Sequence, residues 1–264
     1  MEGKARDDLA IRFGEIVSEA ASLILAIPVS AIGASKKPDG SPVSRADVDA
    51  EKLILARLRT LLPDTPVIAE ESFAADSDEV PERFLLVDPL DGTREFLAGH
   101  KDYTVNIGLI SAGVPIVGAI CAPASGEVFV GGAKAFQAPL AKSGALTSLT
   151  EIGGAPIPQA GLRAVVSRSH LDAGSEQWIR DHAVAELKRA GSSLKFCLLA
   201  RGEADVYPRL APTMEWDTAA GHAILNAAGG CVLDPEGSPL AYGKKHSGFK
   251  NPGFIAWGRK PADA

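Results

Sequence analysis

The segment from Arg83 to Thr93 constrains the fold of this chain more than any other. Its first five residues, Arg83-Phe84-Leu85-Leu86-Val87, are mostly apolar and predict a buried β-strand. Proline cannot continue a central strand, so Pro89 predicts that the strand ends at Asp88. Asp91 follows three residues later, which lets two carboxylates at one strand edge point into the same crevice. A short helix is predicted to begin at Thr93.

Gly92 and Thr93 add a second property to this strand end. Glycine has no Cβ, so the backbone at Gly92 can approach a ligand closely. The first amides of a helix lack intrahelical acceptors, so a helix that starts at Thr93 can hold a phosphate group. Asp, Pro and Gly are also common turn residues. This segment alone therefore supports a phosphate site and an ordinary turn equally.

Apolar spacing predicts the other elements of the first half. Helices are expected over residues 7–26 and 46–62. The loop from Gly33 to Pro42 between them contains lysines and glycines, which suit a connector or a lid over a substrate. Short turns join three further strands, which predicts an antiparallel meander. These strands are Thr104–Ser111, Val114–Ala122 and Glu127–Gly131.

A stretch rich in Gly, Ser, Pro and Ala, from Pro139 to Gly161, is the best candidate for a boundary. We expect an α+β domain over residues 1–150 that binds metal and phosphate, and an α/β domain over residues 151–264 that completes the site. The fold class is therefore mixed α/β. The elements expected in the second half are strands Arg163–Ser167, Ala204–Tyr207 and Cys231–Leu233, and helices Ser175–Ala190, Ser192–Ala200 and Trp216–Ala228.

Composition excludes several classes of function. The net charge of −6 gives no general attraction to nucleic acid or anionic lipid, so no nucleic-acid partner is expected. Three isolated cysteines form no CxxC pair and predict neither a zinc nor a redox site. No apolar run reaches the length of a membrane span, and the first residues do not resemble a signal peptide. We expect a cytoplasmic protein, with peripheral contact at the inner face of the cell membrane left open.

Three further acidic residues lie near predicted element ends. Glu70, in Glu70-Glu71-Ser72, follows an apolar segment, although paired loop glutamates are usually solvated. Asp47 lies three residues after Ser44, the spacing of a helix capping box. Asp217, in Trp216-Asp217-Thr218, is predicted in a first helical turn, where the helix dipole alone favours an acid. Each residue singly has an ordinary structural explanation.

The five acids together predict a metal site. Asp47, Glu70, Asp88, Asp91 and Asp217 all offer hard oxygen ligands, which suit magnesium or manganese rather than zinc. Several carboxylates that share one site would repel each other without a cation. Two such ions can polarise a phosphoryl group and stabilise the leaving oxygen.

The order of these motifs resembles the inositol monophosphatase superfamily. The resemblance rests on Pro42–Asp47, Glu70-Glu71-Ser72, Val87–Thr93, Trp216–Gly221 and Asn251–Phe254, so it spans nearly the whole chain. It implies a layered α/β/α/β/α sandwich with the active site between two halves. It also implies a phosphatase that depends on two or three Mg²⁺ ions, accepts Mn²⁺ in their place and is inhibited by Li⁺.

The resemblance assigns roles position by position. Glu70, Asp88 and the Leu90 carbonyl resemble the ligands of the first ion. Asp88, Asp91 and Asp217 resemble those of the second. Thr93 and Asp47 resemble the pair that orients the attacking water, and the amides of Gly92 and Thr93 would hold the phosphate. Glu70 would assist as a base or hold a further ion through water.

Within the superfamily, the second half is most similar to CysQ-type 3′(2′),5′-bisphosphate nucleotidases. The similarity lies in Val166–His170, Gly191–Leu198 and Gly202–Arg209. It implies that a nucleotide and its second phosphate are bound by His170, Ser192, Lys195 and Arg209, with Asp217 also beside the substrate. Lysine offers phosphate a point charge and arginine a bidentate fork. Lys195 as a solvated helix residue, Arg209 as a rim charge and His170 as a local hydrogen-bonding residue remain alternatives.

The resulting hypothesis is hydrolysis of adenosine 3′,5′-bisphosphate to AMP and phosphate, in sulfur assimilation and nucleotide recycling. An inositol or sugar monophosphatase is the alternative within the superfamily. A catalytically silent binding protein and a hydrolase based on Ser169 and His170 are rivals from other classes. Glu215, next to the Trp-Asp motif, would alter base or ribose preference if it faced the nucleotide. Monomer and homodimer are both left open.

Overall fold

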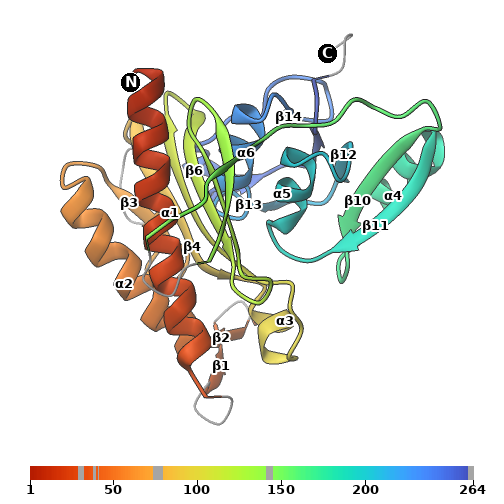
Figure 1. The fold of residues 1–264 in the computed structure, drawn as a ribbon. Coiled ribbons are helices and arrows are strands. Elements are labelled where there is room, and N and C mark those ends of the chain that lie inside the picture. Colours follow the sequence, from red (N-terminus) through yellow and green to blue (C-terminus); the bar gives the residue numbers. More distant parts are fainter. Residues whose placement is uncertain (29–32, 38–39, 41, 74–79, 141–144, 261–264) are drawn as a thin grey trace.

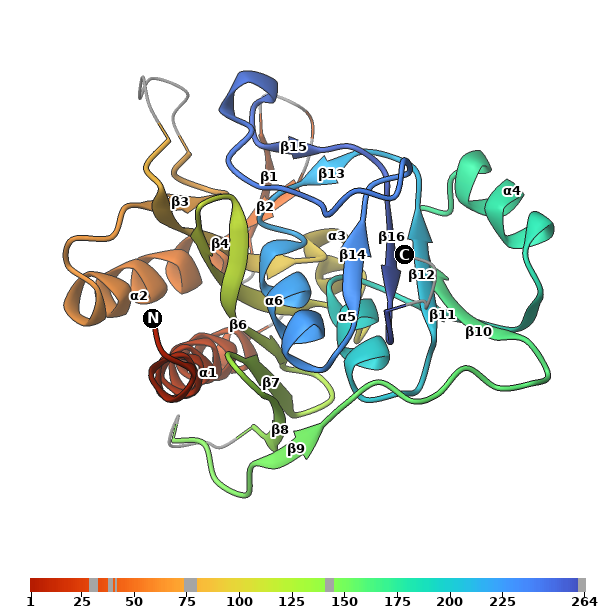
Figure 2. The ribbon, with the colours of Figure 1, turned by 90° about the horizontal axis from the view of Figure 1, so that it is seen from above.

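The structure is a computed structural model that describes residues 1–28, 33–37, 40, 42–73, 80–140 and 145–260. Two large β-sheets alternate with three layers of helices (Figures 1 and 2). This arrangement confirms the predicted mixed α/β sandwich. No helix in the described part of the chain is long and apolar enough to cross a membrane.

The larger sheet has seven strands in the order β3-β4-β5-β6-β7-β8-β9. Only β3 and β4 pair in parallel, and the remaining neighbours are antiparallel, as the short turns between them predict. The strands are β3 (Val67–Ala69), β4 (Arg83–Asp91), β5 (Thr104–Ser111), β6 (Val114–Ala122), β7 (Glu127–Gly131), β8 (Ala135–Pro139) and β9 (Thr150–Ile152).

The smaller sheet has five strands in the order β11-β10-β12-β16-β14. They are β10 (Leu162–Ser167), β11 (Val184–Ala190), β12 (Val206–Arg209), β14 (Cys231–Leu233) and β16 (Phe254–Trp257). Two short pairs complete the strands: β1 (Ala34–Lys36) with β2 (Pro42–Ser44), and β13 (Thr213–Met214) with β15 (Lys250–Asn251). The first sheet ends at Ile152 and the second begins at Leu162. The division into domains at residue 150 stays a prediction.

Helices cover both faces of each sheet. On the outer face of the seven-stranded sheet lie α1 (Gly3–Ala26) and α2 (Arg45–Leu61) (Figure 2). Between the two sheets lie α5 (Leu194–Ala200) and α6 (Ala219–Ala227). The outer layer on the other side is α4 (Ala173–Asp181), which packs on β12. The short helix α3 (Thr93–Leu97) follows β4, as predicted, and a 3₁₀ turn, η2, spans Lys245–Ser247.

The predicted helix Ser175–Ala190 is wrong in its second half. The helix ends at Asp181, and residues 184–190 form β11, which pairs in parallel with β10. Five consecutive residues of β11, Ala185–Arg189, are exposed, because this strand lies at the sheet edge. The spacing of Trp178, Ile179 and Leu187 suits a helix, but pairing with β10 decides the structure.

The strand that ends in Asp88-Pro89 also runs further than predicted. β4 continues to Asp91, and its pairing with β5 skips Pro89 and Leu90, with a register shift between Asp88 and Asp91. The missing amide of Pro89 is tolerated because no ladder bond is needed inside this irregularity. The result is that Asp88 and Asp91 still lie at the end of one strand.

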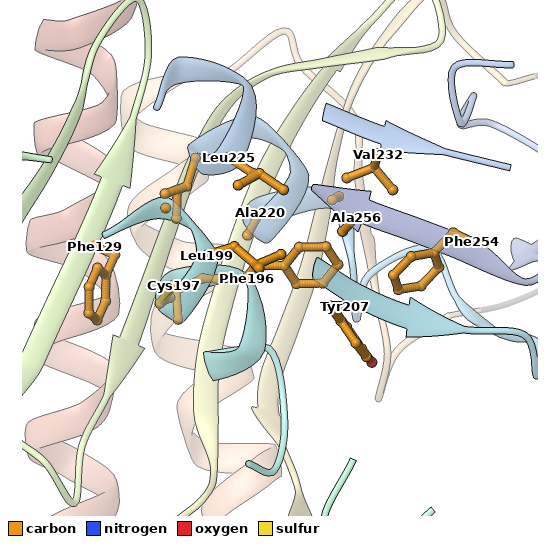
Figure 3. Close-up of a cluster of buried hydrophobic side chains, with 14 of the residues drawn as sticks. Phe129, Phe196, Cys197, Leu199, Tyr207, Ala220, Leu225, Val232, Phe254 and Ala256 are labelled. Atoms are coloured by element: carbon orange, nitrogen blue, oxygen red, sulfur yellow. The ribbon is translucent and has the colours of Figure 1, made fainter. Parts of the chain in front are cut away.

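The core between the sheets is built around α5. Phe196 of α5 lies 5.5 Å from the ring of Tyr207 and 5.7 Å from that of Phe254 (centroid to centroid; Figure 3). Both partners belong to the five-stranded sheet, whereas Phe129 of the same buried cluster comes from the seven-stranded sheet. The apolar cluster therefore fixes the distance between the two sheets.

A row of glycines lets α6 pack directly on the seven-stranded sheet. Gly108, Gly118 and Gly131 are neighbours in register on β5, β6 and β7. A Cβ at Gly118 would lie 2.4 Å from the carbonyl oxygen of Ala220, and one at Gly131 would lie 2.5 Å from Cα of Ile224. Such distances are closer than real Cβ contacts, so any larger residue must push α6 away.

We predict that Gly118→Ala destabilises the protein by about 1–3 kcal/mol, the usual cost of overpacking. The matched control is Gly153→Ala, whose added Cβ would meet only the Ala228 carbonyl oxygen at 3.6 Å. Urea unfolding of both variants gives the comparison. Equal midpoints for the two variants would contradict the close packing of α6 on this row.

Candidate metal and phosphate site

A cleft of about 310 Å³ opens between the end of β4 and the second half of the chain. The first half contributes α3, and the second half contributes the loop after β10, the start of α5, β12 and β13. Nine residues predicted from the sequence line this cleft: Glu70, Asp91, Gly92, Thr93, His170, Ser192, Lys195, Arg209 and Asp217. Asp47, Asp88 and Leu90 are buried directly behind it.

Three carboxylates converge at the cleft. Asp88, Asp91 and Asp217 each offer an oxygen, and these oxygens all lie within 4.8 Å of one another. Asp88 and Asp91 come from the end of β4, as the sequence predicts. Asp217 lies just before α6 rather than inside its first turn. The two halves of the chain therefore share this cluster.

The charges of these carboxylates oppose one another. Burial raises the pKa of Asp88 well above its usual value, and the charges of Glu70, Asp91 and Asp217 raise it further. Burial, together with the charges of Asp91 and Glu70, raises the pKa of Asp217 to about 7, against opposing effects from Thr213 and Arg209. Hard oxygen donors that repel each other in a buried site fit one or more divalent cations such as Mg²⁺.

Hydrogen bonds fix the orientation of each carboxylate. The amide of Leu90 donates to Asp88 Oδ1 over 3.0 Å. Ser192 Oγ donates to Asp91 Oδ2 over 2.7 Å. Asp217 Oδ2 accepts from the hydroxyl of Thr213 and the amide of Met214. These donors use one oxygen of each carboxylate. Among the described residues the other oxygens accept no hydrogen bond, so they can bind a cation.

Glu70 lies in the same cleft but outside the three-carboxylate group. Its Oε1 accepts a hydrogen bond of 2.6 Å from Lys37 Nζ, which also lies 2.7 Å from Glu71 Oε1. Burial acts to lower the pKa of Lys37, but the charges and hydrogen bonds of the two glutamates raise it overall. The ammonium group of Lys37 therefore neutralises the negative charge of Glu70, as a metal ion bound to Glu70 would. Residues 38, 39 and 41 of the predicted Gly33–Pro42 loop lie outside the described residues.

Asp47 joins the helix cap to the site. Its Oδ2 accepts from the amide and hydroxyl of Ser44, which is the capping box expected from the sequence. Its Oδ1 accepts from Thr93 Oγ1 over 2.7 Å. The buried carboxylate of Asp47 therefore both caps the helix and contacts the site through Thr93. Because the Thr93 hydroxyl donates to Asp47, its oxygen can accept a hydrogen bond from a water molecule.

Two cationic side chains, Lys195 and Arg209, line the same cleft. Lys195 is only 3% exposed, so it is not the solvated helix residue of the alternative interpretation. Its Nζ donates to the Ser192 carbonyl and lies 5.1 Å from the centroid of the Tyr207 ring. Arg209 has a buried Nε without a hydrogen-bond partner among the described residues. Neither side chain forms an ion pair with a carboxylate in the described part of the chain.

The Ser169–His170 pair is not arranged as a nucleophile and its base. Ser169 Oγ donates to Glu95 Oε1 over 2.8 Å, while His170 Nε2 lies 3.5 Å from Arg94 Nη1. The two side chains therefore face different partners. The sequence reasoning missed Arg94 and Lys37 as parts of the cleft and its surroundings. The only feature of the sequence that could have indicated Arg94 as a cleft residue is its position directly after Thr93.

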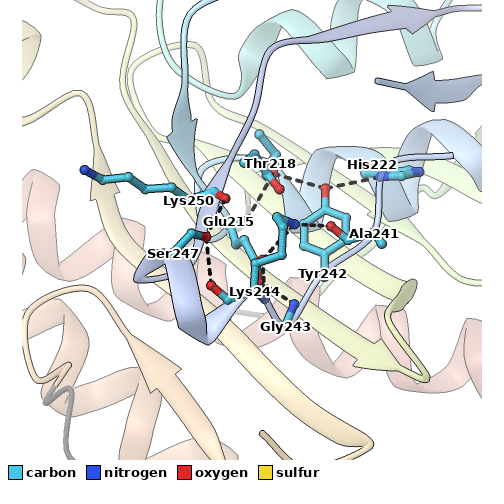
Figure 4. A network of polar contacts seen from close by, with 10 residues as sticks. Glu215, Thr218, His222, Ala241, Tyr242, Gly243, Lys244, Ser247 and Lys250 are labelled. Atoms are coloured by element: carbon cyan, nitrogen blue, oxygen red, sulfur yellow. Dashed lines mark hydrogen bonds and ion pairs between the residues drawn. The ribbon is translucent and has the colours of Figure 1, made fainter. Parts of the chain in front are cut away.

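Glu215 does not face the cleft, so the condition under which it would alter base or ribose preference is not met. It is completely buried, does not line the cleft, and lies in a network of polar contacts (Figure 4). Its carboxylate accepts from the amides of Gly243 and Lys244 and pairs with Lys244 Nζ at 2.9 Å. These contacts hold the 243–244 loop against the segment that carries Asp217. Glu215 therefore acts on the shape of the site and not on the substrate directly.

Comparisons with known proteins agree on one family. A family model described as the inositol monophosphatase family matches residues 4–258. The 3′(2′),5′-bisphosphate nucleotidase CysQ of Escherichia coli (strain K12) is 42% identical over 220 residues, which is 83% of this chain and 86% of that protein.

Two solved structures show the same fold. CysQ from Bacteroides thetaiotaomicron, described as a bacterial member of the inositol monophosphatase family, has a TM-score of 0.81 and 34% identity. The match covers 96% of this chain and 98% of that one. An inositol monophosphatase from Zymomonas mobilis has a TM-score of 0.73 and 25% identity, covering 97% and 94%.

We predict that the metal-free protein loses stability as the pH rises. In the folded state the pKa of Asp217 is about 7, against an ordinary value of 3.8. Between these values the folded protein holds a proton that the unfolded chain has released, so the loss occurs from about pH 4 to about pH 7. It amounts to at most about 1.4 kcal/mol per pH unit from this group. Urea unfolding in EDTA measures it.

Asp217→Asn should flatten this pH dependence, and Mg²⁺ should remove much of it in the unmodified protein, because cations bind the ionised carboxylates. The matched control is Asp64→Asn, at an exposed position outside the cleft. If the free energy of unfolding of Asp217→Asn depended on pH as steeply as that of the unmodified protein, the pH dependence would not come from Asp217.

Proposed function

The chain belongs to the inositol monophosphatase family, and we propose that it is a magnesium-dependent 3′(2′),5′-bisphosphate nucleotidase that hydrolyses adenosine 3′,5′-bisphosphate to AMP and phosphate. The observation that carries this proposal is that one cleft combines a carboxylate cluster with two cationic side chains. Lys195 and Arg209 line this cleft without an ion pair to a carboxylate among the described residues. The 42% identity to a bisphosphate nucleotidase supports the same substrate class.

The carboxylate cluster would bind, through metal ions, the phosphate that is removed. Asp88, Asp91, Asp217, Glu70 and the Leu90 carbonyl would hold two or three Mg²⁺ ions, which supply the positive charge that polarises the phosphoryl group and stabilises the leaving oxygen. The amides of Gly92 and Thr93 would donate to the phosphate oxygens. Gly92 suits this position because its φ of +94° is one that other residues rarely adopt.

Thr93 and Asp47 would orient the water that attacks. The Thr93 hydroxyl donates to Asp47 Oδ1, so its oxygen accepts from the water and leaves the water lone pair directed at phosphorus. Asp47 is buried and held by Ser44 through its other oxygen, so this pair is fixed before the substrate binds. Preorganised groups of this kind avoid reorganisation during the reaction.

Lys195 and Arg209 would bind the phosphate that the product retains. Lys195 would supply a point charge and Arg209 a fork, with Ser192 and His170 beside the nucleotide. A substrate with a single phosphate has less need for two such cations. The physiological role that follows is removal of a nucleotide by-product of sulfate assimilation.

A panel of phosphate esters tests this proposal directly. We expect kcat/KM for adenosine 3′,5′-bisphosphate to exceed that for inositol 1-phosphate by at least about tenfold, because inositol 1-phosphate lacks the second phosphate and a lost contact to a charged group costs about 1.5–3 kcal/mol. Phosphate release is measured with Mg²⁺, with Mn²⁺ in its place, with added Li⁺ and with EDTA. Activity should require the divalent cation and fall with Li⁺.

Asp88→Asn is the inactive control for the panel, because it removes a shared carboxylate and leaves a side chain of the same shape. Faster turnover of inositol 1-phosphate would replace the proposal by an inositol monophosphatase. A protein that binds these esters but hydrolyses none would instead be a catalytically silent binding protein.

Lys195→Ala should raise KM for adenosine 3′,5′-bisphosphate by about tenfold or more, and raise it far less for adenosine 3′-monophosphate. Lys195→Met keeps the stem that packs on Tyr207 and separates loss of charge from loss of packing. Initial rates with both substrates provide the two KM values. Equal increases for both would mean that Lys195 does not contact the second phosphate.

A further inference from the structure

Three consecutive residues after β10 reach across the cleft to the first half of the chain. Arg168 Nε donates to Asp102 Oδ2 over 2.5 Å, and Ser169 Oγ donates to Glu95 Oε1 over 2.8 Å. His170 Nε2 lies 3.5 Å from Arg94 Nη1. We call these three contacts the clasp. They join the loop after β10 to α3 and to the loop that follows it.

The third contact of the clasp differs from the other two. Arg168 and Ser169 each donate to a carboxylate, which is a matched and short interaction. Arg94 instead meets a histidine nitrogen at the upper limit of hydrogen-bond length. A guanidinium group has five N–H donors and no acceptor, so a single long contact leaves most of them unused.

Arg94 is an exposed side chain at the lining of the cleft. It forms no ion pair with a carboxylate within the residues that the structure describes, although Glu95 follows it directly. Glu95 is engaged by Ser169, and Asp102 is engaged by Arg168. Arg94 shares this cleft with Thr93 from the first half and with Lys195 and Arg209 from the second half.

We propose that Arg94 is a specificity-determining residue that binds the phosphate retained by the nucleotide product, from the first half of the chain. This inference rests on the proposed bisphosphate nucleotidase function. When a phosphate binds beside Lys195 and Arg209, Arg94 would give up its long contact with His170 and donate two parallel N–H···O bonds to the phosphate. His170, once released, can donate to the same anion or to the ribose.

The clasp gives Arg94 a fixed starting position. Glu95 and Asp102 anchor the backbone on the C-terminal side of Arg94, and Thr93 is held by Asp47 on the other side. Only the arginine side chain needs to move when the anion binds, so less conformational freedom is lost than in an unanchored loop. Cations from both halves would then surround one phosphate.

The experiment compares Arg94→Gln and Arg94→Lys on two substrates, adenosine 3′,5′-bisphosphate and adenosine 3′-monophosphate. We expect Arg94→Gln to raise the ratio of the two KM values by about tenfold or more, and Arg94→Lys to raise it less, because lysine keeps the charge but not the fork. Calorimetry should show weaker binding of AMP to Arg94→Gln by a similar factor. The matched control is Arg59→Gln, an exposed arginine at the end of α2.

Different failures identify different errors. If the unmodified protein does not hydrolyse the bisphosphate, the proposed function fails, together with the inference that rests on it. If it does hydrolyse the bisphosphate but Arg94→Gln leaves the KM ratio and AMP binding unchanged, only the inference is overturned. A fall in kcat of equal size on both substrates would show that Arg94 acts through Thr93 instead, and would also overturn it.

Discussion

The repulsion among Asp88, Asp91 and Asp217 is the constraint on which the rest of this structure depends. Their oxygens lie within 4.8 Å of one another, and burial raises the pKa values of Asp88 and Asp217. Such an arrangement is unfavourable in a protein without cations and persists only when the surrounding structure holds it in place. The fold must therefore supply enough packing and hydrogen bonding to keep three carboxyl groups together before any ion or substrate binds.

The packing of α6 on the glycine row meets this demand. Gly108, Gly118 and Gly131 bring the backbone of α6 against the seven-stranded sheet, and Asp217 directly precedes that helix. Behind it, Glu215 ties the same segment to Gly243 and Lys244, with no exposed surface. Close packing on one side and the contacts of Glu215 on the other leave the Asp217 backbone little freedom. The carboxylate cluster is thus an outcome of how two sheets share one helical layer.

Sequence reasoning succeeded where chemistry and local geometry coincide. Asp88, Asp91 and the helix at Thr93 follow from a strand end, a proline and a glycine, which act over a few residues. It failed where pairing partners are distant in sequence. The edge strand β11 depends on β10, and the orientation of Glu215 depends on a loop 28 residues further on. Lys37 and Arg94 carry charge that no local pattern distinguishes from an ordinary solvated side chain.

Ser192 connects the carboxylate cluster to Lys195, and this connection limits how far the positions of the two can change independently. Its hydroxyl donates to Asp91, whereas its carbonyl accepts from Lys195. Its φ of +54° is unusual for a residue other than glycine, so the turn is held in this form by its partners. A change at Ser192 therefore affects both Asp91 and Lys195. The carboxylate cluster and one of the two cationic side chains are consequently held by a single turn.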